Sequence, residues 1–342
     1  MKIVYVGPLW SGGTCLMRMR ALQSLGHDVI GINTEPQTPT SPISDISARI
    51  MRRLGRPLDR FGLNDQIVST VLEQRPAIVW IDKGLSVRPE TLSTIRRSEA
   101  MISIVGYSPD DMYGTHNQSA YFLRGLPLYD TFITTKSFNV DELRRLGARN
   151  VLFIGNGFDP DTHKPMHVTP EDRCTFGGAV GFIGAWEKER GSQMLSLAKA
   201  GVGVRVWGWQ PPKGLFQVKH ANLVVEGRPL WGSDYVKAIC GFDINLGFLR
   251  KQNRDLETTR SIEIPACGAF MLAERTKEHL ILFEEGKEAE FFGSTEELIS
   301  KCKFYLVHEE IRKKIAAAGR IRCLKSGYSN RDRIDAILRQ IK

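Results

Sequence analysis

The sequence predicts an α/β protein made of two Rossmann-like domains with parallel sheets. Short apolar segments alternate with helical segments up to about residue 154, and the alternation starts again near residue 179. Such alternation is expected when helices cover both faces of a parallel sheet. Residues 155–170 concentrate Gly, Asn, Asp and Pro, as interdomain connections do. The length of 342 residues also suits two domains rather than one.

The first predicted domain, residues 1–160, begins with a strand, a glycine-containing loop and a helix. Apolar runs without polar alternation indicate buried strands, and helices are recognised by apolar positions three and four residues apart. The predicted strands are 1–7, 29–32, 77–82, 101–106, 130–135 and 151–154, and the predicted helices are 14–25, 64–74, 88–97, 118–128 and 139–146.

The second predicted domain, residues 172–325, repeats the same plan. A last segment, 326–342, is expected to be a C-terminal helix that packs back on the first domain. The predicted strands are 179–183, 204–207, 223–225, 242–249 and 269–273, and the predicted helices are 191–200, 233–240, 260–267, 295–307, 309–323 and 330–341.

Composition narrows the function classes. A hydrophobic fraction of 42% and a charged fraction of 25% are those of a globular protein. Because no apolar run is long enough to span a bilayer and no signal peptide opens the chain, we expect a cytoplasmic protein. The six cysteines show no metal-ligand spacing, so we expect buried thiols and no metal site. The net charge of +9 suits an anionic substrate, a membrane surface or nucleic acid without choosing among them.

One polar loop of the first half combines two carboxylates with a histidine. Residues 107–119 follow the apolar strand 101–106, at the edge where open α/β sheets bind ligands. Asp110 and His116 could act as a base or orient a substrate hydroxyl. The alternative is an Asx turn followed by a helix cap.

The stretch 260–268 (RSIEIPACG) is the centre of the second half. It opens helical, with Ile262 and Ala266 on one face, and it breaks at Gly268, a residue favoured just past a helix end. A helix N-terminus suits anionic ligands. Arg250, Lys251 and Arg260 surround this helix start, as a pyrophosphate would require.

This stretch resembles the Arg-x-x-Glu-(small)-x-Ala-x-Gly signature of the GT-B glycosyltransferases, in the branch near family 4 and the CgeB-like proteins. The resemblance implies two domains facing each other across a cleft, with Glu263 binding the ribose of a sugar nucleotide. A solvated helix carboxylate and a simple helix C-cap are the alternative interpretation of the same residues. The family's Glu-x7-Glu pair is incomplete here, because Asp255 stands at the first position, as CgeB-like members also lack that Glu.

The resemblance also assigns roles to loops. It implies that Gly184, Gly208 and either Lys188 or Arg190 meet the donor diphosphate, and Arg190 is preferred because its planar fork pairs bidentately with phosphate. The loop 11–13 (Ser, Gly, Gly) would face the acceptor. Three further segments are similar to segments of the family: 155–165, 284–292 and the stretch that holds Tyr328 and Arg331. The stretch with Tyr328 and Arg331 is a degraded motif that lacks its first His.

The sequence therefore predicts a glycosyltransferase, of hexosyltransferase type, that uses a UDP- or GDP-sugar as substrate and no further cofactor. We expect a retaining, metal-independent reaction on a glycan, lipid or small-molecule acceptor. A DNA-modifying glycosyltransferase, a sugar-nucleotide epimerase and a binding-only relative are the alternatives. The arginine-rich segment 49–60 could form a membrane or acceptor patch, or only a solvated basic helix. Nucleic acid ranks lower because no nucleic-acid-binding module is found.

Overall fold

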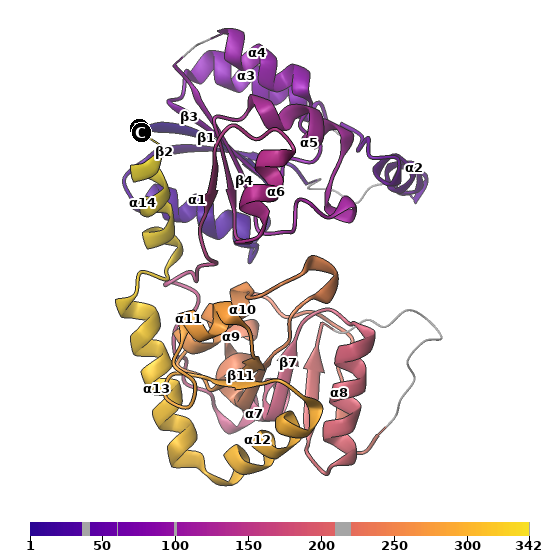
Figure 1. Cartoon of the computed structure of the whole chain (residues 1–342), viewed down its shortest axis with the longest axis vertical. Helices are drawn as coiled ribbons and strands as arrows, with labels where there is room; N and C mark the ends of the chain where they lie inside the picture. Colours follow the sequence, from indigo (N-terminus) through magenta and orange to yellow (C-terminus); the bar gives the residue numbers. More distant parts are fainter. Residues whose placement is uncertain (36–41, 60, 99–100, 209–219, 342) are drawn as a thin grey trace. The chain divides into compact units, whose positions relative to one another are not determined.

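The computed structural model describes residues 1–35, 42–59, 61–98, 101–208 and 220–341; of residues 42–46 and 49 only the backbone is described. The chain divides into two compact units. The first consists of Met1–Gly155 together with Asn330–Lys342, and the second of Asn156–Ser329. Each unit is an α/β sandwich (Figure 1), as the sequence predicts. No helix in the described part of the chain has the length and apolar character needed to cross a bilayer.

The first unit is built on a six-stranded sheet in the order β2-β1-β3-β4-β5-β6. Its described pairings are all parallel. The strands are β1 (Lys2–Gly7), β2 (Asp28–Asn33), β3 (Ile78–Asp82), β4 (Ser103–Ser108), β5 (Thr131–Thr134) and β6 (Val151–Phe153). The helices are α1 (Thr14–Ser24), α2 (Pro42–Arg53), α3 (Leu63–Gln74), α4 (Pro89–Ser98), α5 (Ala120–Gly125), α6 (Asn139–Arg145) and α14 (Asn330–Gln340).

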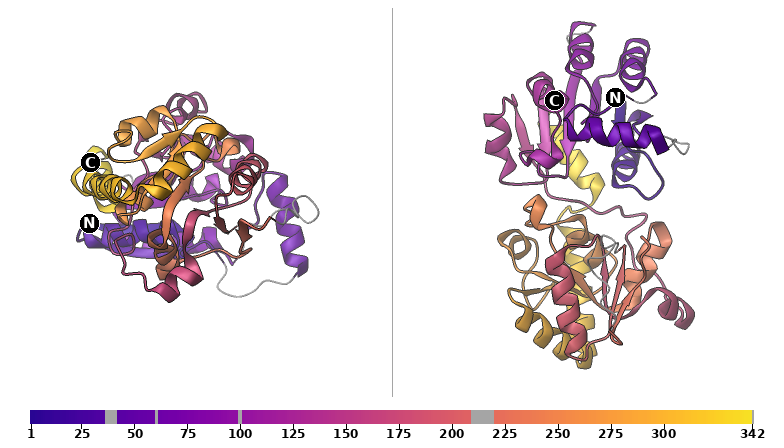
Figure 2. Two further views of the ribbon diagram at one scale, coloured as in Figure 1. Left: turned by 90° about the horizontal axis from the view of Figure 1, so that it is seen from below. Right: turned by 90° about the vertical axis from the view of Figure 1, so that its right-hand side faces the viewer.

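Successive side chains of β1 enter different layers of this unit, as strand geometry requires. Val4 and Val6 pack in a core with residues of α3, α4, α5 and α6, whereas Ile3 and Tyr5 pack with residues of α1 and α14. The C-terminal helix α14 contributes Ile334 to this second layer and lies beside α1 (Figure 1). Both chain ends therefore belong to the first unit (Figure 2).

The second unit has a six-stranded sheet in the order β12-β11-β10-β7-β8-β9. Its described pairings are also parallel. The strands are β7 (Gly178–Ile183), β8 (Val204–Trp207), β9 (Leu223–Val225), β10 (Phe242–Gly247), β11 (Met271–Glu274) and β12 (Glu290–Phe292). The helices are α7 (Pro170–Phe176), α8 (Lys188–Lys199), α9 (Gly232–Gly241), α10 (Thr259–Ala266), α11 (Lys277–Leu282), α12 (Thr295–Val307) and α13 (Glu309–Lys325).

Helices again cover both faces of the second sheet. Met194 of α8 and Leu298 of α12 share one core with Val180 and Phe182 of β7. Ile239 of α9 and residues of α10 share the other. Strands buried on both faces explain the continuous apolar runs seen in the sequence.

Helices α7 and α11 and strand β12 go beyond the sequence prediction. Helix α7 lies at the end of the predicted connection, where Thr169 accepts a hydrogen bond from the Asp172 N–H and the Asp172 carboxylate accepts one from the Thr169 N–H. This capping box and Pro170 at the first helical position both favour a helix start here. Strand β12 was not predicted because its three residues begin with the charged Glu290 and follow an acidic turn.

Candidate functional site

Two arginines meet at the carboxyl edge of the second sheet. Arg190 comes from the first turn of α8 and Arg260 from the first turn of α10. Their guanidinium carbons lie 5.6 and 5.8 Å from the centre of the Phe182 ring, at the end of β7. Two predicted donor-site residues, 70 positions apart in the chain, are thus brought onto one aromatic platform.

The Arg190 guanidinium is buried, and only part of its hydrogen-bonding capacity is used. Nη1 donates to the carbonyl of Ala185 at 3.0 Å. Nε and Nη2 are buried and have no hydrogen-bond partner among the described residues, although the Glu187 carboxylate lies 3.8 Å from Nε. The Nε of Arg260 is also buried and has no hydrogen-bond partner among the described residues. Buried donors of this kind are costly unless a ligand accepts from them.

The electrostatics of Arg190 give the same indication. Burial, and next the charge of Arg260, lower the pKa of the Arg190 guanidinium to about 10. Two like charges that disfavour each other in a dry site are stabilised when an anion lies between them. This arrangement is suited to a phosphate or diphosphate group.

The remaining basic candidates of this edge are paired or exposed. Arg250 lies 3.6 Å from a carboxylate oxygen of Glu187, which also faces Arg190. Lys251 forms an ion pair with Glu274 at the end of β11. Lys188 is exposed. Arg190 and Arg260 are therefore the better-placed anion ligands of the predicted set.

Gly184 and Gly208 allow the ends of β7 and β8 to approach each other. Gly208 has φ +77°, and a Cβ built there would lie 3.3 Å from the carbonyl oxygen of Gly184. Gly184 donates its N–H to the Trp207 carbonyl at 2.9 Å. A side chain at position 208 would be strained by its backbone angle. These glycines shape the turns at the edge that carries Arg190.

A buried polar network fixes the start of α10. The Ser261 hydroxyl accepts from the Thr258 N–H at 3.0 Å and lies 2.7 Å from Nε2 of His279. Nδ1 of His279 is 2.6 Å from the Glu274 carbonyl and must donate to it, so Nε2 accepts from Ser261 in the neutral ring. Burial lowers the pKa of His279, which keeps the ring neutral. The helix start that carries Arg260 is held rigidly.

Glu263 is buried inside this unit. Its Oε2 accepts from the Tyr235 hydroxyl at 2.5 Å, and its Oε1 lies 3.7 Å from Nε2 of His163. Nδ1 of His163 accepts the Asp159 N–H at 3.0 Å, so the neutral ring turns its Nε2–H toward Glu263. Burial raises the pKa of Tyr235, and the Glu263 charge adds to this effect. The interpretation of Glu263 as a solvated carboxylate is therefore wrong; its role toward ribose stays a prediction.

The first unit carries its own cavity at the carboxyl edge of its sheet. The cavity measures about 270 Å³. It lies where the loops after β1, β3 and β4 meet, with Arg52 of α2 beside them. The predicted loop 11–13 is flanked by two of its lining residues, Trp10 and Thr14; the others that matter here are Cys15, Lys83, Asp110 and Asn117.

Asp110 and His116 are not equivalent in this cavity. Asp110 lines it and lies 3.5 Å from Nζ of Lys83, whose backbone has φ +56°. His116 is exposed and does not line the cavity. The neighbouring Asp111 is buried and accepts from the Tyr113 N–H and the Asn139 amide. Asp111 thus supplies the predicted Asx turn, and the Asp110 carboxylate lines the cavity beside Lys83.

A buried ion pair lies behind the cavity-lining Cys15. One oxygen of Asp82 accepts from Nε of Arg18 at 2.7 Å and from the Tyr5 hydroxyl at 2.6 Å. Nη2 of Arg18 donates to the sulfur of Cys15 at 3.3 Å, and burial raises the pKa of that thiol to about 12. This network orders the ends of β1 and β3.

Other predictions fall elsewhere. Of the arginine-rich segment, the side chain of Arg49 and the whole of Arg60 lie outside the described residues, whereas Arg52 lines the first-unit cavity. Tyr328 is buried and donates to the carbonyl of Leu282 at 3.1 Å. Asp255 accepts from Nδ2 of Asn253 at 2.7 Å. Of the six free cysteines, four are buried, Cys174 is exposed and Cys240 is part-buried. Among the described residues no three His, Cys, Asp or Glu side chains form a group that could hold a metal ion.

Comparison with known proteins connects these features with a family. Residues 187–339 match the family model described as glycosyl transferase-like. A comparison of the sequence with curated proteins finds no match.

Solved structures share the fold over the whole chain. Sucrose-phosphate synthase from Thermosynechococcus elongatus aligns with a TM-score of 0.66 at 12% identity, covering 100% of this chain and 99% of that one. HepE of Anabaena in complex with UDP and glucose aligns with a TM-score of 0.63 at 14% identity, covering 100% and 99%. A glycosyltransferase from Rickettsia africae aligns with a TM-score of 0.65 at 13% identity, covering 100% and 97%. The predicted resemblance to GT-B glycosyltransferases is confirmed, while its CgeB-like branch stays a prediction.

Proposed function

Because the chain has the GT-B fold and a glycosyl transferase-like second half, we propose that it transfers a sugar from a nucleotide-sugar donor to an acceptor hydroxyl. In this reaction the bond between the sugar's anomeric carbon and the diphosphate breaks, and a bond to the acceptor oxygen forms. The acceptor hydroxyl loses its proton, and the nucleoside diphosphate leaves with increased negative charge. The second unit binds the donor.

The observation that carries the proposal is the arginine pair on Phe182. Arg190 has two buried groups without hydrogen-bond partners, and Arg260 has one, counted over the described residues. A diphosphate would accept from these groups and separate the two like charges. Donors aimed at a leaving group lower the barrier of its departure. This arrangement lets the protein itself neutralise the leaving group, in keeping with a metal-independent reaction.

The donor nucleotide is proposed to be a UDP-sugar. HepE of Anabaena has been solved with UDP and with UDP-glucose, and it shares the fold of this chain. The Glu263 carboxylate, held by Tyr235 at 2.5 Å, would accept from ribose hydroxyls. Retention of the anomeric configuration and a hexose as the transferred sugar are part of the same proposal, and they rest on the family resemblance.

The acceptor is proposed to bind the cavity of the first unit. Its wall combines Trp10 with Asp110, an aromatic surface beside a carboxylate that can orient or deprotonate a hydroxyl. A glycan, a lipid-linked sugar or a small polyol fits this chemistry. A nucleic-acid acceptor ranks below them, although one similar structure is an α-glucosyltransferase in complex with UDP and DNA.

The test is incubation of the protein with a panel of nucleotide sugars, with and without candidate acceptors, following both free nucleotide and donor identity. A transferase releases UDP and needs an acceptor or water. Another similar structure is described as a candidate UDP-N-acetylglucosamine 2-epimerase. An epimerase would return an isomerised nucleotide sugar in the absence of an acceptor. A binding-only protein would bind UDP and change nothing. Either of the last two results would contradict the proposal.

A further inference from the structure

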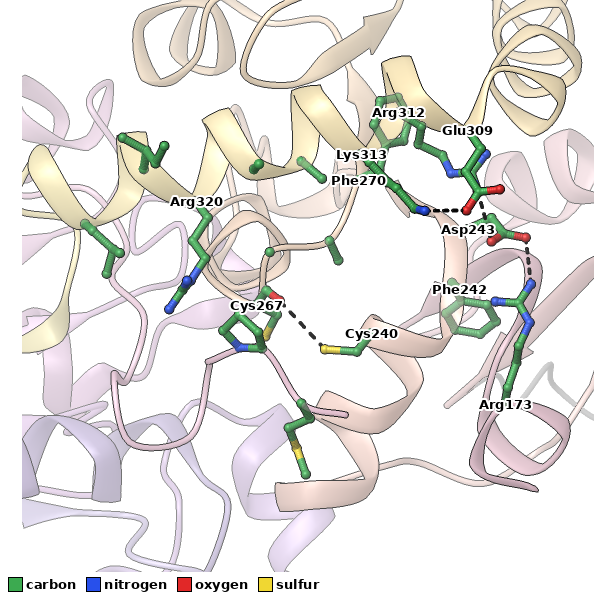
Figure 3. A pocket seen from close by; sticks show the side chains of 18 residues that line it. Arg173, Cys240, Phe242, Asp243, Cys267, Phe270, Glu309, Arg312, Lys313 and Arg320 are labelled. Atoms are coloured by element: carbon green, nitrogen blue, oxygen red, sulfur yellow. Dashed lines mark hydrogen bonds and ion pairs between the residues drawn. The ribbon is translucent and has the colours of Figure 1, made fainter. Parts of the chain in front are cut away.

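The second unit holds a larger cavity that the proposed reaction does not use. It measures about 560 Å³ and lies at the amino end of β10, beside Phe242 and Asp243 (Figure 3). It also borders Cys267 and Gly268, which follow the C-terminal end of α10. The eight residues of α10 span about 12 Å, so this end of the helix is remote from the start that carries Arg260.

One face of α13 forms a wall of the cavity. Lys313, Ala317, Arg320 and Leu324 all line it, and they follow one another at helical spacings of three or four residues. The small residue Ala317 leaves room between the helix and the opposite wall. The face is apolar along its middle and basic at Lys313 and Arg320.

The charges of the lining favour an anion. Four basic and two acidic side chains line the cavity, which leaves an excess of two positive charges. Asp243 pairs with Arg173 at 2.7 Å and with Arg312 at 3.1 Å, at one end of the cavity (Figure 3). Glu309 pairs with Lys313 at 2.7 Å.

Arg320 differs from the other three basic residues. No carboxylate lies within ion-pair distance of it in the described part of the chain, and its buried Nε has no hydrogen-bond partner there. Arg320 comes from α13 at the end of the cavity opposite Arg173 (Figure 3). A buried donor of this kind calls for an acceptor from a ligand.

Apolar surface lies next to Arg320. Ile321 is 52% exposed and Leu324 is 55% exposed, and both line the cavity with Phe270. Burying such surface against an alkyl or ring group is favourable at about 25 cal/mol per Å².

We propose that this cavity binds a small amphiphilic anion, with a phosphate or carboxylate head on Arg320 and an apolar part along Phe270, Ile321 and Leu324. The site is separate from the donor edge. A ligand there would not compete with a nucleotide.

The cavity contains a natural reporter. The sulfur of Cys240 faces it, 3.7 Å from the carbonyl oxygen of Cys267 (Figure 3). The neighbouring Cys267 side chain lowers the pKa of Cys240 to about 7. A thiol with this property alkylates readily near neutral pH. A bound ligand would shield it.

The experiment is calorimetry of octyl phosphate and of octanoate against the full chain, with inorganic phosphate and octanol as probes of head and tail alone. Octyl phosphate should bind at least roughly tenfold more tightly than either part, which corresponds to about 1.4 kcal/mol. Arg320→Gln should weaken it at least roughly tenfold. Lys314→Gln is the matched control, since Lys314 is an exposed residue of the same helix outside the lining.

Two further measurements distinguish the site from others. Mass spectrometry after iodoacetamide labelling should show octyl phosphate slowing alkylation of Cys240 and not of the exposed Cys174. Ala317→Phe should abolish binding by filling the groove, while thermal unfolding stays unchanged because Ala317 is exposed. Equal affinity in Arg320→Gln and Lys314→Gln, displacement by UDP, or no binding to the wild type would each overturn the proposal.

Discussion

Replacing Arg190 by Met should stabilise the free protein and weaken its affinity for UDP. The pKa of about 10 means that the folded state disfavours the charged guanidinium by about 3 kcal/mol relative to an ordinary arginine. Met replaces the apolar stem of the arginine and carries no charge, although it lacks the end of the guanidinium. The variant loses the hydrogen bond to the Ala185 carbonyl, worth about 1 kcal/mol. The remainder is a gain of about 1–2 kcal/mol in the free energy of unfolding.

Nucleotide affinity should move in the opposite direction. Two charge-assisted hydrogen bonds from Nε and Nη2 to a diphosphate are worth about 3 kcal/mol together. Their loss weakens UDP binding by a factor of about 100. If the variant bound UDP weakly because its fold were damaged, its free energy of unfolding would be lower than that of the wild type and not higher.

The assay combines calorimetry of UDP with urea unfolding, on wild type, Arg190→Met and Lys188→Met. Lys188 is the control because it lies in the same helical turn and is exposed, so its removal should change affinity less than about threefold. If Arg190→Met binds UDP as the wild type does, Arg190 is not a diphosphate ligand. If it is destabilised by more than about 1 kcal/mol, the guanidinium is a structural group and the reasoning about its burial is wrong.

Four other changes test the remaining groups. Glu263→Ala should weaken UDP binding at least roughly tenfold by calorimetry, whereas Glu310→Ala, at an exposed position, should leave the affinity unchanged. Equal UDP affinities in the two variants would mean that Glu263 is not part of the donor site. Asp110→Asn should lower turnover at least roughly tenfold with UDP affinity intact, whereas His116→Ala should change turnover less than threefold because His116 does not line the cavity. Full activity in both variants would mean that the acceptor does not bind beside Asp110. Arg18→Met should lower the free energy of unfolding in urea by about 3–5 kcal/mol because it leaves Asp82 buried without its cation, and adding Asp82→Leu should recover part of this loss. An Arg18→Met variant as stable as the wild type would contradict the stabilising role of the buried pair. Alkylation of Cys240 should reach half its maximal rate near pH 7 and slow at lower pH, because the thiolate is the reacting form and the pKa of Cys240 is lowered. Cys302, with its pKa raised to about 12 by burial, should stay unreactive, and equal rates for the two cysteines would contradict the lowered pKa of Cys240.

The sequence predicted the fold well because its signals are local. Buried strands of a parallel sheet are continuous apolar runs, and Gly26 and Gly268, with φ +82° and +72°, follow the ends of α1 and α10. The elements it missed have weaker local signals. Strand β12 begins with a charged residue after an acidic turn, and α11 has only six residues. Helix α7 depends on reciprocal hydrogen bonds between Thr169 and Asp172 in a segment rich in turn residues.

The candidate site could be predicted only in part, because its electrostatics depend on residues far apart in the chain. The sequence singled out Arg190, Arg260 and Glu263 one by one. It could not show that the first two share the Phe182 ring, nor that Tyr235, 28 residues away, donates to Glu263. His163 stood in the linker segment with no sign of its position near Glu263.

Net charge is a poor guide to partners here because pairing decides which cations can act. Arg173, Arg205 and Arg275 count among the 47 Lys and Arg residues behind the net charge of +9, yet each has a carboxylate within 2.7 Å. The charge of a cation in an ion pair is largely cancelled by the neighbouring carboxylate. Such a cation therefore adds little to the attraction of a polyanion such as DNA. Arg190 and Arg320 keep buried groups without hydrogen-bond partners among the described residues. Buried groups of this kind can each be satisfied by one small anionic ligand, whereas an extended polyanion cannot enter either place.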